Sequence, residues 1–223
     1  MATLGGRRLR LAVFYGPMCA AKTDSLIALA VALPSTLQRV VIASAVDTRG
    51  SGDALVSRTG ARLTADTRLN SLSSIIPKPQ HLYVLDEMQF FPSGDVIQFS
   101  KAVSQMEGSA LLAAGLDLDF RGEPFGDTIA LANRARAMGT KNGGLVVPLT
   151  ARCAYSSMSG ALPCGAAATH TQRLRSTTSN QIDDSRIVVA GGEESYRPVC
   201  ATHHSPFPVD GTCFSTFSPS QAH

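Results

Sequence analysis

Largely apolar runs, separated by stretches of helical character, recur through the first part of the chain. Such runs occupy residues 9–15, 40–44, 82–85 and 110–114, and residues 25–33 have the pattern of a helix. Short apolar runs joined by crossovers are typical of strands that are buried on both faces of a parallel sheet. The pattern therefore predicts an α/β domain over residues 1–150, with helices on both faces of a parallel sheet.

The pattern changes after residue 150, where Gly, Ala, Ser, Thr and Cys dominate as far as residue 204. Apolar runs are short in this segment, so it cannot form a large core of its own, and a bound metal ion would be one way to stabilise it. We therefore predict a small metal-stapled subdomain at residues 151–204. Residues 205–223 are rich in Ser, Pro and Thr, and we expect them to form a flexible tail.

Composition and charge narrow the class of protein. The chain has 223 residues, of which 44% are hydrophobic and 17% charged, and its formal net charge is +3. So small and scattered an excess of positive charge favours neither nucleic acid nor a membrane surface as a partner. No apolar run approaches the roughly 20 residues of a membrane span. The basic residues near the N-terminus are not followed by a signal-like apolar segment, and we expect a cytoplasmic protein.

The sequence GPMCAAKT, from Gly16 to Thr23, follows the first predicted strand and precedes the first predicted helix. In this setting backbone N–H groups surround a phosphate at the helix N-terminus, a lysine binds the β- and γ-phosphates, and a hydroxyl binds Mg²⁺. Lys22 and Thr23 supply the last two groups. Ala21 replaces the usual glycine, which would cost about 1 kcal/mol if φ is positive there. The alternative is a strand, turn and helix that carry Lys-Thr by chance.

Two carboxylates, Asp86 and Glu87, follow the predicted strand at residues 82–85. Ligands of doubly wound folds bind at the carboxyl ends of the strands, so we expect Asp86 to face the phosphate-binding loop and to hold Mg²⁺. Glu87 is then free to accept a proton from an attacking hydroxyl. The alternative is that the two acids cap the next element.

The five cysteines are an odd number, and one of them belongs to the sequence Cys200-Ala-Thr-His203. A two-residue gap lets two ligands bind the same tetrahedral ion. Cys153 and Cys164 could complete a zinc site, although ten residues separate them instead of the usual two to four. Because cysteine also packs as a small apolar residue, spacing alone leaves the zinc site open.

Taken together, these motifs resemble those of the type II (cellular-type) thymidine kinases. The family's first motif reads approximately Gly-Pro-Met-Phe-Ser/Ala-Gly-Lys-Thr/Ser, and its second reads Asp-Glu-x-Gln-Phe-Phe; the chain has GPMCAAKT at residues 16–23 and DEMQFF at residues 86–91. Further segments resemble the family in the same order, at residues 47–49, 57–60, 115–125, 168–174 and 191–200. The resemblance covers residues 8–204.

The resemblance implies a P-loop (RecA-like) fold and ATP-dependent phosphorylation of the thymidine 5′-hydroxyl in pyrimidine salvage, with deoxyuridine as a second candidate substrate. It implies that Glu87 is the base, that Lys22 and Arg49 take part in catalysis, and that Thr23 and Asp86 hold Mg²⁺. The thymine contacts would come from Met18, Leu116, Phe120 and Tyr196. The nucleotide-binding residues would be Gly16, Pro17, Met18, Cys19, Ala20, Ala21, Lys22, Thr23, Asp86 and Gln89.

The resemblance also implies the zinc ligands Cys153, Cys164, Cys200 and His203. In the family the segment between the second and third ligands, here residues 165–199, is a lasso-like loop that closes over the base. Family members are commonly homotetramers that thymidine triphosphate inhibits, and the same is implied for this chain. Neither nucleic acid nor a membrane is an expected partner.

The chain departs from the family pattern at Ala21, at Asp24, and in two apparent insertions, one before Cys164 and one around residues 139–144. A carboxylate at Asp24 suits the helix dipole but repels a bound polyphosphate. These departures favour a second hypothesis, a regulatory or scaffold homologue that binds nucleotide but has lost most activity. A third hypothesis, an unrelated P-loop ATPase, requires the later motifs to be coincidental.

Overall fold

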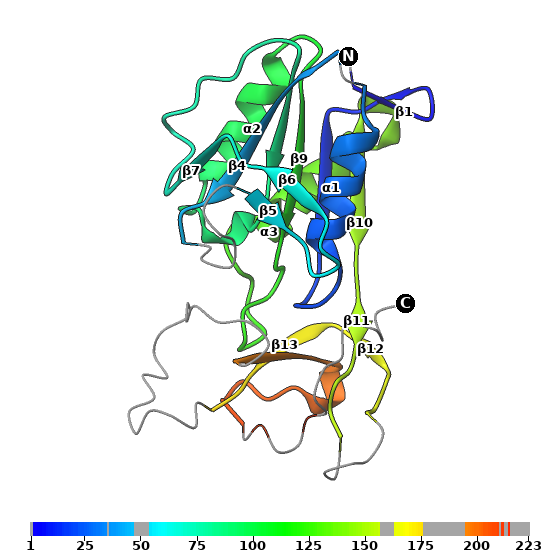
Figure 1. Ribbon diagram of the computed structural model, residues 1–223, viewed down its shortest axis with the longest axis vertical. Helices are drawn as coiled ribbons and strands as arrows, with labels where there is room; N and C mark the ends of the chain where they lie inside the picture. The colour runs from blue at the N-terminus through cyan, green and yellow to red at the C-terminus, as the bar shows by residue number, and fades with distance from the viewer. Residues whose placement is uncertain are drawn as a thin grey trace. The chain divides into compact units, whose positions relative to one another are not determined.

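The computed structural model describes residues 2–34, 36–46, 54–156, 163–175, 195–209, 211 and 214. The chain divides into two compact units, and each is considered by itself (Figure 1). The first unit consists of Met1–Tyr15, Ala21–Asp117 and Phe125–Pro148, and the second of Gly16–Ala20, Leu118–Pro124 and Leu149–His223. Arg49, most of the predicted lasso and most of the predicted tail lie outside the described residues.

A six-stranded sheet in which all strands are parallel forms the centre of the first unit, in the order β10-β3-β9-β8-β4-β7. Its four inner strands are those that the apolar runs predict, and the parallel sheet is confirmed. The inner strands are β3 (Leu11–Tyr15), β9 (Ala110–Gly115), β8 (His81–Leu85) and β4 (Gln38–Ser44), and the edge strands are β10 (Gly144–Pro148) and β7 (Thr67–Leu69).

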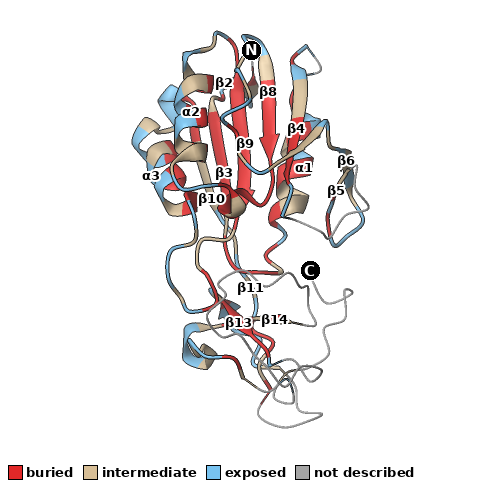
Figure 2. Cartoon of the chain, turned by 90° about the vertical axis from the view of Figure 1, so that its left-hand side faces the viewer, coloured by how far each residue is buried: buried red, intermediate tan, exposed pale blue. Residues whose placement is uncertain are grey.

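Helices cover both faces of this sheet, as predicted. Figure 2 shows α2 (Asp95–Gln105) and α3 (Thr128–Met138) on one face and α1 (Lys22–Ala32) on the other. A hydrophobic core cluster joins Val13 of β3 and Leu85 of β8 to Phe99 of α2 and Leu131 of α3, all nearly inaccessible to solvent. No helix in the described ranges is long and apolar enough to cross a membrane.

Short elements complete both units. The first contains the hairpins β1 (Thr3–Leu4) with β2 (Arg7–Arg8) and β5 (Ala54–Val56) with β6 (Arg62–Thr64), and the 3₁₀ turns η1 (Met88–Phe90) and η2 (Thr140–Asn142). In the second, β11 (Ala151–Arg152) pairs with β12 (Ala167–Ala168), and β13 (His170–Arg173) pairs with β14 (Tyr196–Val199), both antiparallel. The turn η3 (Ala201–His203) follows β14.

The glycine-rich segment at residues 139–144 is a tight connection from α3 to the edge strand β10. Gly139 ends the helix with φ 62°, and Gly143 follows η2 with φ 84°, both in the left-handed region that favours glycine. At Gly144 a Cβ would lie 2.1 Å from the carbonyl oxygen of Ala135 in α3. Close approach of α3 therefore requires glycine at the first residue of β10.

We expect Gly144→Ala to lower the free energy of unfolding by about 1–3 kcal/mol, since the added methyl overpacks the contact between α3 and β10. Chemical denaturation measures this change. The matched control is Gly211→Ala, because the nearest atom to a Cβ there is 3.8 Å away. Equal stability of the two variants would contradict the close contact at Gly144.

Candidate active site and metal centre

The loop between β3 and α1 contains backbone conformations that only a few residue types adopt easily. At Gly16 a Cβ would lie 2.1 Å from the carbonyl oxygen of Leu149, so the position requires glycine. Cys19 has φ 65°, and Ala21, the N-cap of α1, has φ 52° and ψ 30°. Ala21 therefore occupies the left-handed conformation in which alanine costs about 1 kcal/mol relative to glycine.

The side chains of Thr23 and Asp86 meet at the carboxyl-terminal edge of the sheet. β8, which precedes Asp86, is separated from β3 by β9, and all three strands run parallel. The Thr23 hydroxyl donates a hydrogen bond of 2.9 Å to Oδ2 of Asp86, and the neighbouring Lys22 is buried. A hydroxyl and a carboxylate are oxygen ligands of the kind that Mg²⁺ prefers. The pair therefore fits the predicted magnesium site.

Gln89 holds the carboxylate of Glu87. Its Nε2 donates a hydrogen bond of 2.5 Å to Oε2 of Glu87, and its Oε1 accepts one of 3.0 Å from the backbone N–H of Leu116. Because a backbone N–H can only donate, the orientation of the Gln89 amide is fixed. Gly115 makes room for this arrangement, since a Cβ there would lie 2.7 Å from Oε1 of Gln89. Glu87 is thus a buried, oriented carboxylate.

Asp24 anchors the turn between β5 and β6. The Thr59 hydroxyl donates to Oδ1 of Asp24, the Ser57 and Thr59 hydroxyls lie 3.1 Å apart, and the N–H of Ala61 donates to the Ser57 hydroxyl at 3.0 Å. The Ser57 hydroxyl therefore donates to the Thr59 hydroxyl, because the proton of the Thr59 hydroxyl is already donated to the Asp24 carboxylate. Asp24, expected to repel polyphosphate, therefore also fixes a neighbouring turn.

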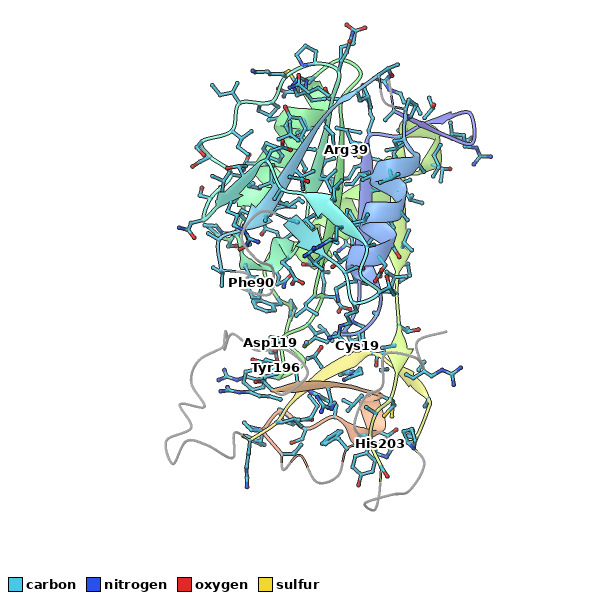
Figure 3. The ribbon with its side chains drawn as sticks, in the orientation of Figure 1. Cys19, Arg39, Phe90, Asp119, Tyr196 and His203 are labelled. Atoms are coloured by element: carbon cyan, nitrogen blue, oxygen red, sulfur yellow. The ribbon has the colours of Figure 1, made fainter. Side chains whose placement is uncertain are left out.

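Three of the residues expected to contact thymine belong to the second unit. The backbone N–H of Met18 donates a buried hydrogen bond of 3.0 Å to the hydroxyl of Thr171 on β13. The ring of Phe120 is buried, and the guanidinium carbon of Arg173 lies 5.1 Å from its centroid. Tyr196, labelled in Figure 3, pairs with Arg173 across the two strands. The strand β13 thus contacts all three residues.

Cys153, Cys164, Cys200 and His203 form one cluster in the second unit, with their ligand atoms all within 4.8 Å of one another. Nδ1 of His203, a residue labelled in Figure 3, lies 3.5 Å from the sulfur of Cys153 and 3.4 Å from that of Cys200. A tetrahedral zinc ion with ligand distances of roughly 2.0–2.3 Å requires ligand separations of this size. Three sulfurs and an imidazole nitrogen therefore fit zinc.

Backbone pairing explains how Cys153 and Cys164 meet despite the ten residues between them. The N–H of Cys153 donates to the carbonyl of Ala166 at 2.7 Å, and the N–H of Cys164 donates to the carbonyl of Tyr155 at 2.7 Å. These bonds bring the two ends of the insertion together, so that its length does not separate the ligands. The ring of Tyr155 also stacks on that of His203, with centroids 4.0 Å apart.

The thiols of the cluster differ in acidity. Burial raises the pKa of Cys153 to about 11. At Cys200 burial also acts to raise the pKa, but hydrogen bonds from the His203 backbone and from the Cys153 thiol outweigh it, and the pKa is lowered. Because thiolates are the forms that bind metal, a divalent cation would offset the cost of burying the Cys153 thiolate.

Comparison with known proteins identifies the family. A family model described as thymidine kinase matches residues 9–204. The chain belongs to the thymidine kinase family. It is 35% identical over 199 residues to a thymidine kinase of Mycoplasmoides gallisepticum, covering 85% of this chain and 78% of that protein.

Two other relatives support the same family assignment. A thymidine kinase of Coprothermobacter proteolyticus is 34% identical over 199 residues, covering 87% of this chain and 89% of its own length. One of Deinococcus deserti is 33% identical over 210 residues, covering 87% of this chain and 93% of its own. Family membership confirms the resemblance and excludes the hypothesis of an unrelated P-loop ATPase.

Sequence reasoning missed three polar side chains that bind residues it had singled out. Thr59 donates to Asp24, Thr171 accepts from Met18, and His204 binds the carbonyl of Phe120. Thr59 and Thr171 lie within segments that carry the family resemblance, at residues 57–60 and 168–174, but the resemblance gave neither of them a role. His204 follows the Cys-x-x-His motif immediately.

We expect Ala21→Gly to raise the free energy of unfolding by about 1 kcal/mol, since glycine adopts positive φ without the steric cost of a methyl. Denaturant unfolding measures the change. Ala28→Gly is the matched control, because Ala28 is exposed in the interior of the same helix and should lose about 0.5–1 kcal/mol. A loss of stability in both variants would contradict the strain at position 21.

We expect purified protein to contain an equimolar amount of zinc, and Cys164→Ser to weaken zinc binding by more than about tenfold, since even residues that only support a ligand contribute that much. Elemental analysis and titration with a chelating dye measure content and affinity. Cys19→Ser is the control, because Cys19 lies outside the cluster. Full zinc affinity in Cys164→Ser would remove this residue from the site.

Proposed function

We propose that the chain transfers the γ-phosphoryl group of ATP to the 5′-hydroxyl of thymidine, giving thymidine monophosphate and ADP. The thymidine kinase family and the names of the relatives support the nucleoside. The oriented Glu87 carboxylate, together with the bonded pair Thr23 and Asp86, supports the chemistry. The observation that carries most weight is the hydrogen bond from Gln89 to Glu87. It holds the Glu87 carboxylate in one orientation, as a proton acceptor requires.

Each side chain then has a defined task. Lys22 binds the phosphates of ATP through its positive charge. Thr23 and Asp86 would hold Mg²⁺, which would neutralise negative charge on the phosphates. Glu87 accepts the proton of the thymidine 5′-hydroxyl, and the hydroxyl oxygen forms a bond to the γ-phosphorus. The bond between the γ-phosphorus and the bridging oxygen breaks, and ADP leaves with that electron pair. We assign Arg49 to the transferring phosphate by family resemblance.

The thymine contacts proposed from the family are Met18, Leu116, Phe120 and Tyr196, with a lid from residues 165–199 that excludes water. An apolar space for the C5 methyl discriminates against deoxyuridine by only about 1–3 kcal/mol. Deoxyuridine is therefore a weaker substrate in this proposal. Pyrimidine salvage, a cytoplasmic location, a homotetrameric assembly and inhibition by thymidine triphosphate are proposed on the same family resemblance.

One observation favours the second candidate, a nucleotide-binding homologue with weakened activity. Ala21 carries a methyl in a left-handed conformation within the phosphate-binding loop. The hydrogen bond between Thr23 and Asp86 is nevertheless made with Ala21 in place, and no proposed catalytic side chain is missing. We therefore favour an active kinase in which the loop tolerates Ala21.

We expect the purified protein to phosphorylate thymidine with Mg-ATP, deoxyuridine more slowly, and deoxycytidine and purine nucleosides not at all. A chromatographic assay of the nucleoside monophosphates measures each rate. Glu87→Gln should lower kcat for thymidine by about 10²–10⁴-fold, the usual contribution of general base catalysis, with the affinity for ATP retained.

The matched control is Glu107→Gln, because Glu107 lies in the turn between α2 and β9 and has no proposed catalytic role. Inactivity toward every nucleoside in folded, zinc-containing protein would support the binding-only homologue. Full activity of Glu87→Gln would remove Glu87 as the base.

A further inference from the structure

His204 connects the metal cluster to the loop at residues 118–124. It follows the cluster residue His203, and its Nε2 lies 2.9 Å from the carbonyl oxygen of Phe120. Because a carbonyl oxygen only accepts, Nε2 of His204 carries the proton in this bond. The residue after the cluster therefore holds the backbone of the residue proposed to contact thymine.

The ring of His204 is held on two sides. It stacks on the ring of His170, with centroids 4.5 Å apart and 28° between the planes. On another side it approaches Gly122, where a Cβ would lie 3.3 Å from Cε1 of His204. Gly122 also has φ +86°, so a side chain at this position would be strained as well as close. The histidine ring therefore has a defined position.

The segment that follows His204 is fixed to β13. Gln172 is fully buried; its Oε1 accepts from the N–H of Ser205 at 2.7 Å, and its Nε2 donates to the carbonyl of Phe207 at 2.9 Å. These bonds prevent the segment from moving independently of the strand. The metal cluster, β13 and His204 thus form one continuous support.

The loop that carries Phe120 is itself a rigid turn. Oδ1 of Asp119 accepts hydrogen bonds from the backbone N–H groups of Arg121 at 2.8 Å and Glu123 at 3.0 Å. The N–H of Asp119 also donates to the carbonyl of Glu123 at 2.8 Å. A turn with its own internal bonds keeps its shape, so an external tether such as His204 determines where the turn lies.

We propose that His204 is a positioning residue that fixes Phe120 for nucleoside binding, and that it makes the affinity for thymidine depend on an intact metal cluster. The inference rests on the proposed thymidine kinase activity. His204 does not touch the reacting phosphate in this account. Its loss should therefore change the interaction with the nucleoside and leave the interaction with ATP unchanged.

The test compares zinc-loaded His204→Phe and His204→Gln. Phenylalanine keeps the stacking on His170 and removes the donor, so we expect KM for thymidine to rise about fivefold to tenfold, the effect of one lost hydrogen bond. Glutamine supplies an N–H in place of Nε2 and should restore most of the affinity. KM for ATP and the zinc content should equal those of the unchanged protein. His81→Gln, in the first unit, is the control for the loss of a histidine.

Amide hydrogen exchange at residues 118–124 tests the hydrogen bond between His204 and Phe120 without an activity assay. We expect faster exchange in zinc-loaded His204→Phe, and in the unchanged protein after zinc removal. Unchanged exchange and unchanged KM for thymidine in zinc-loaded His204→Phe would overturn the proposal. If the unchanged protein fails to phosphorylate thymidine, the proposed function is wrong, whereas faster exchange would still support the tether. If His204→Phe loses zinc, the same measurements are made on Gly122→Ala, because the added methyl crowds the ring of His204.

Discussion

The hydrogen bond between Thr23 and Asp86 is the contact on which the proposed chemistry depends. It joins the first turn of α1 to the end of β8, although β9 separates β8 from the strand that precedes α1. Parallel strands end at a common edge, so residues far apart in sequence can place their side-chain oxygens at the same point. The buried Lys22 and the held carboxylate of Glu87 are both neighbours in sequence of this pair.

The site contains strained backbone as well as bonded side chains. Ala21 and Glu87 are non-glycine residues in the left-handed region, with φ 52° and 51°. Such conformations cost roughly 1–3 kcal/mol each and persist where the surrounding contacts determine them. For Glu87 those contacts are the hydrogen bond from Gln89 and that of its own N–H to Asp86. For Ala21 one such contact is the hydrogen bond of 3.0 Å that its carbonyl accepts from the N–H of Ser25 in the first turn of α1.

The sequence predicted the strands that a local run of apolar residues marks. Four apolar runs became the inner strands, because such runs are stable only when both faces are covered. β10 was missed, because Gly144–Pro148 begins with a glycine, ends with a proline and follows a glycine-rich segment that resembles a loop. The ten-residue gap before Cys164 was misleading, since backbone pairing with Tyr155 returns the chain to Cys153. The contacts of Gln89, Thr59 and His204 depend on tertiary structure, and no local pattern contains them.

The central claim is that Thr23 and Asp86 act together on one magnesium-bound nucleotide. Calorimetric affinities for Mg-ATP of Thr23→Ala, Asp86→Asn and the double variant test it directly. We predict that each single change weakens the binding of Mg-ATP by about tenfold or more and that the double variant binds hardly more weakly than either single variant. The effects of groups that share one ion on the binding free energy are not additive. Without Mg²⁺ the losses of affinity should vanish. Additive losses, or losses that persist without Mg²⁺, would contradict the account.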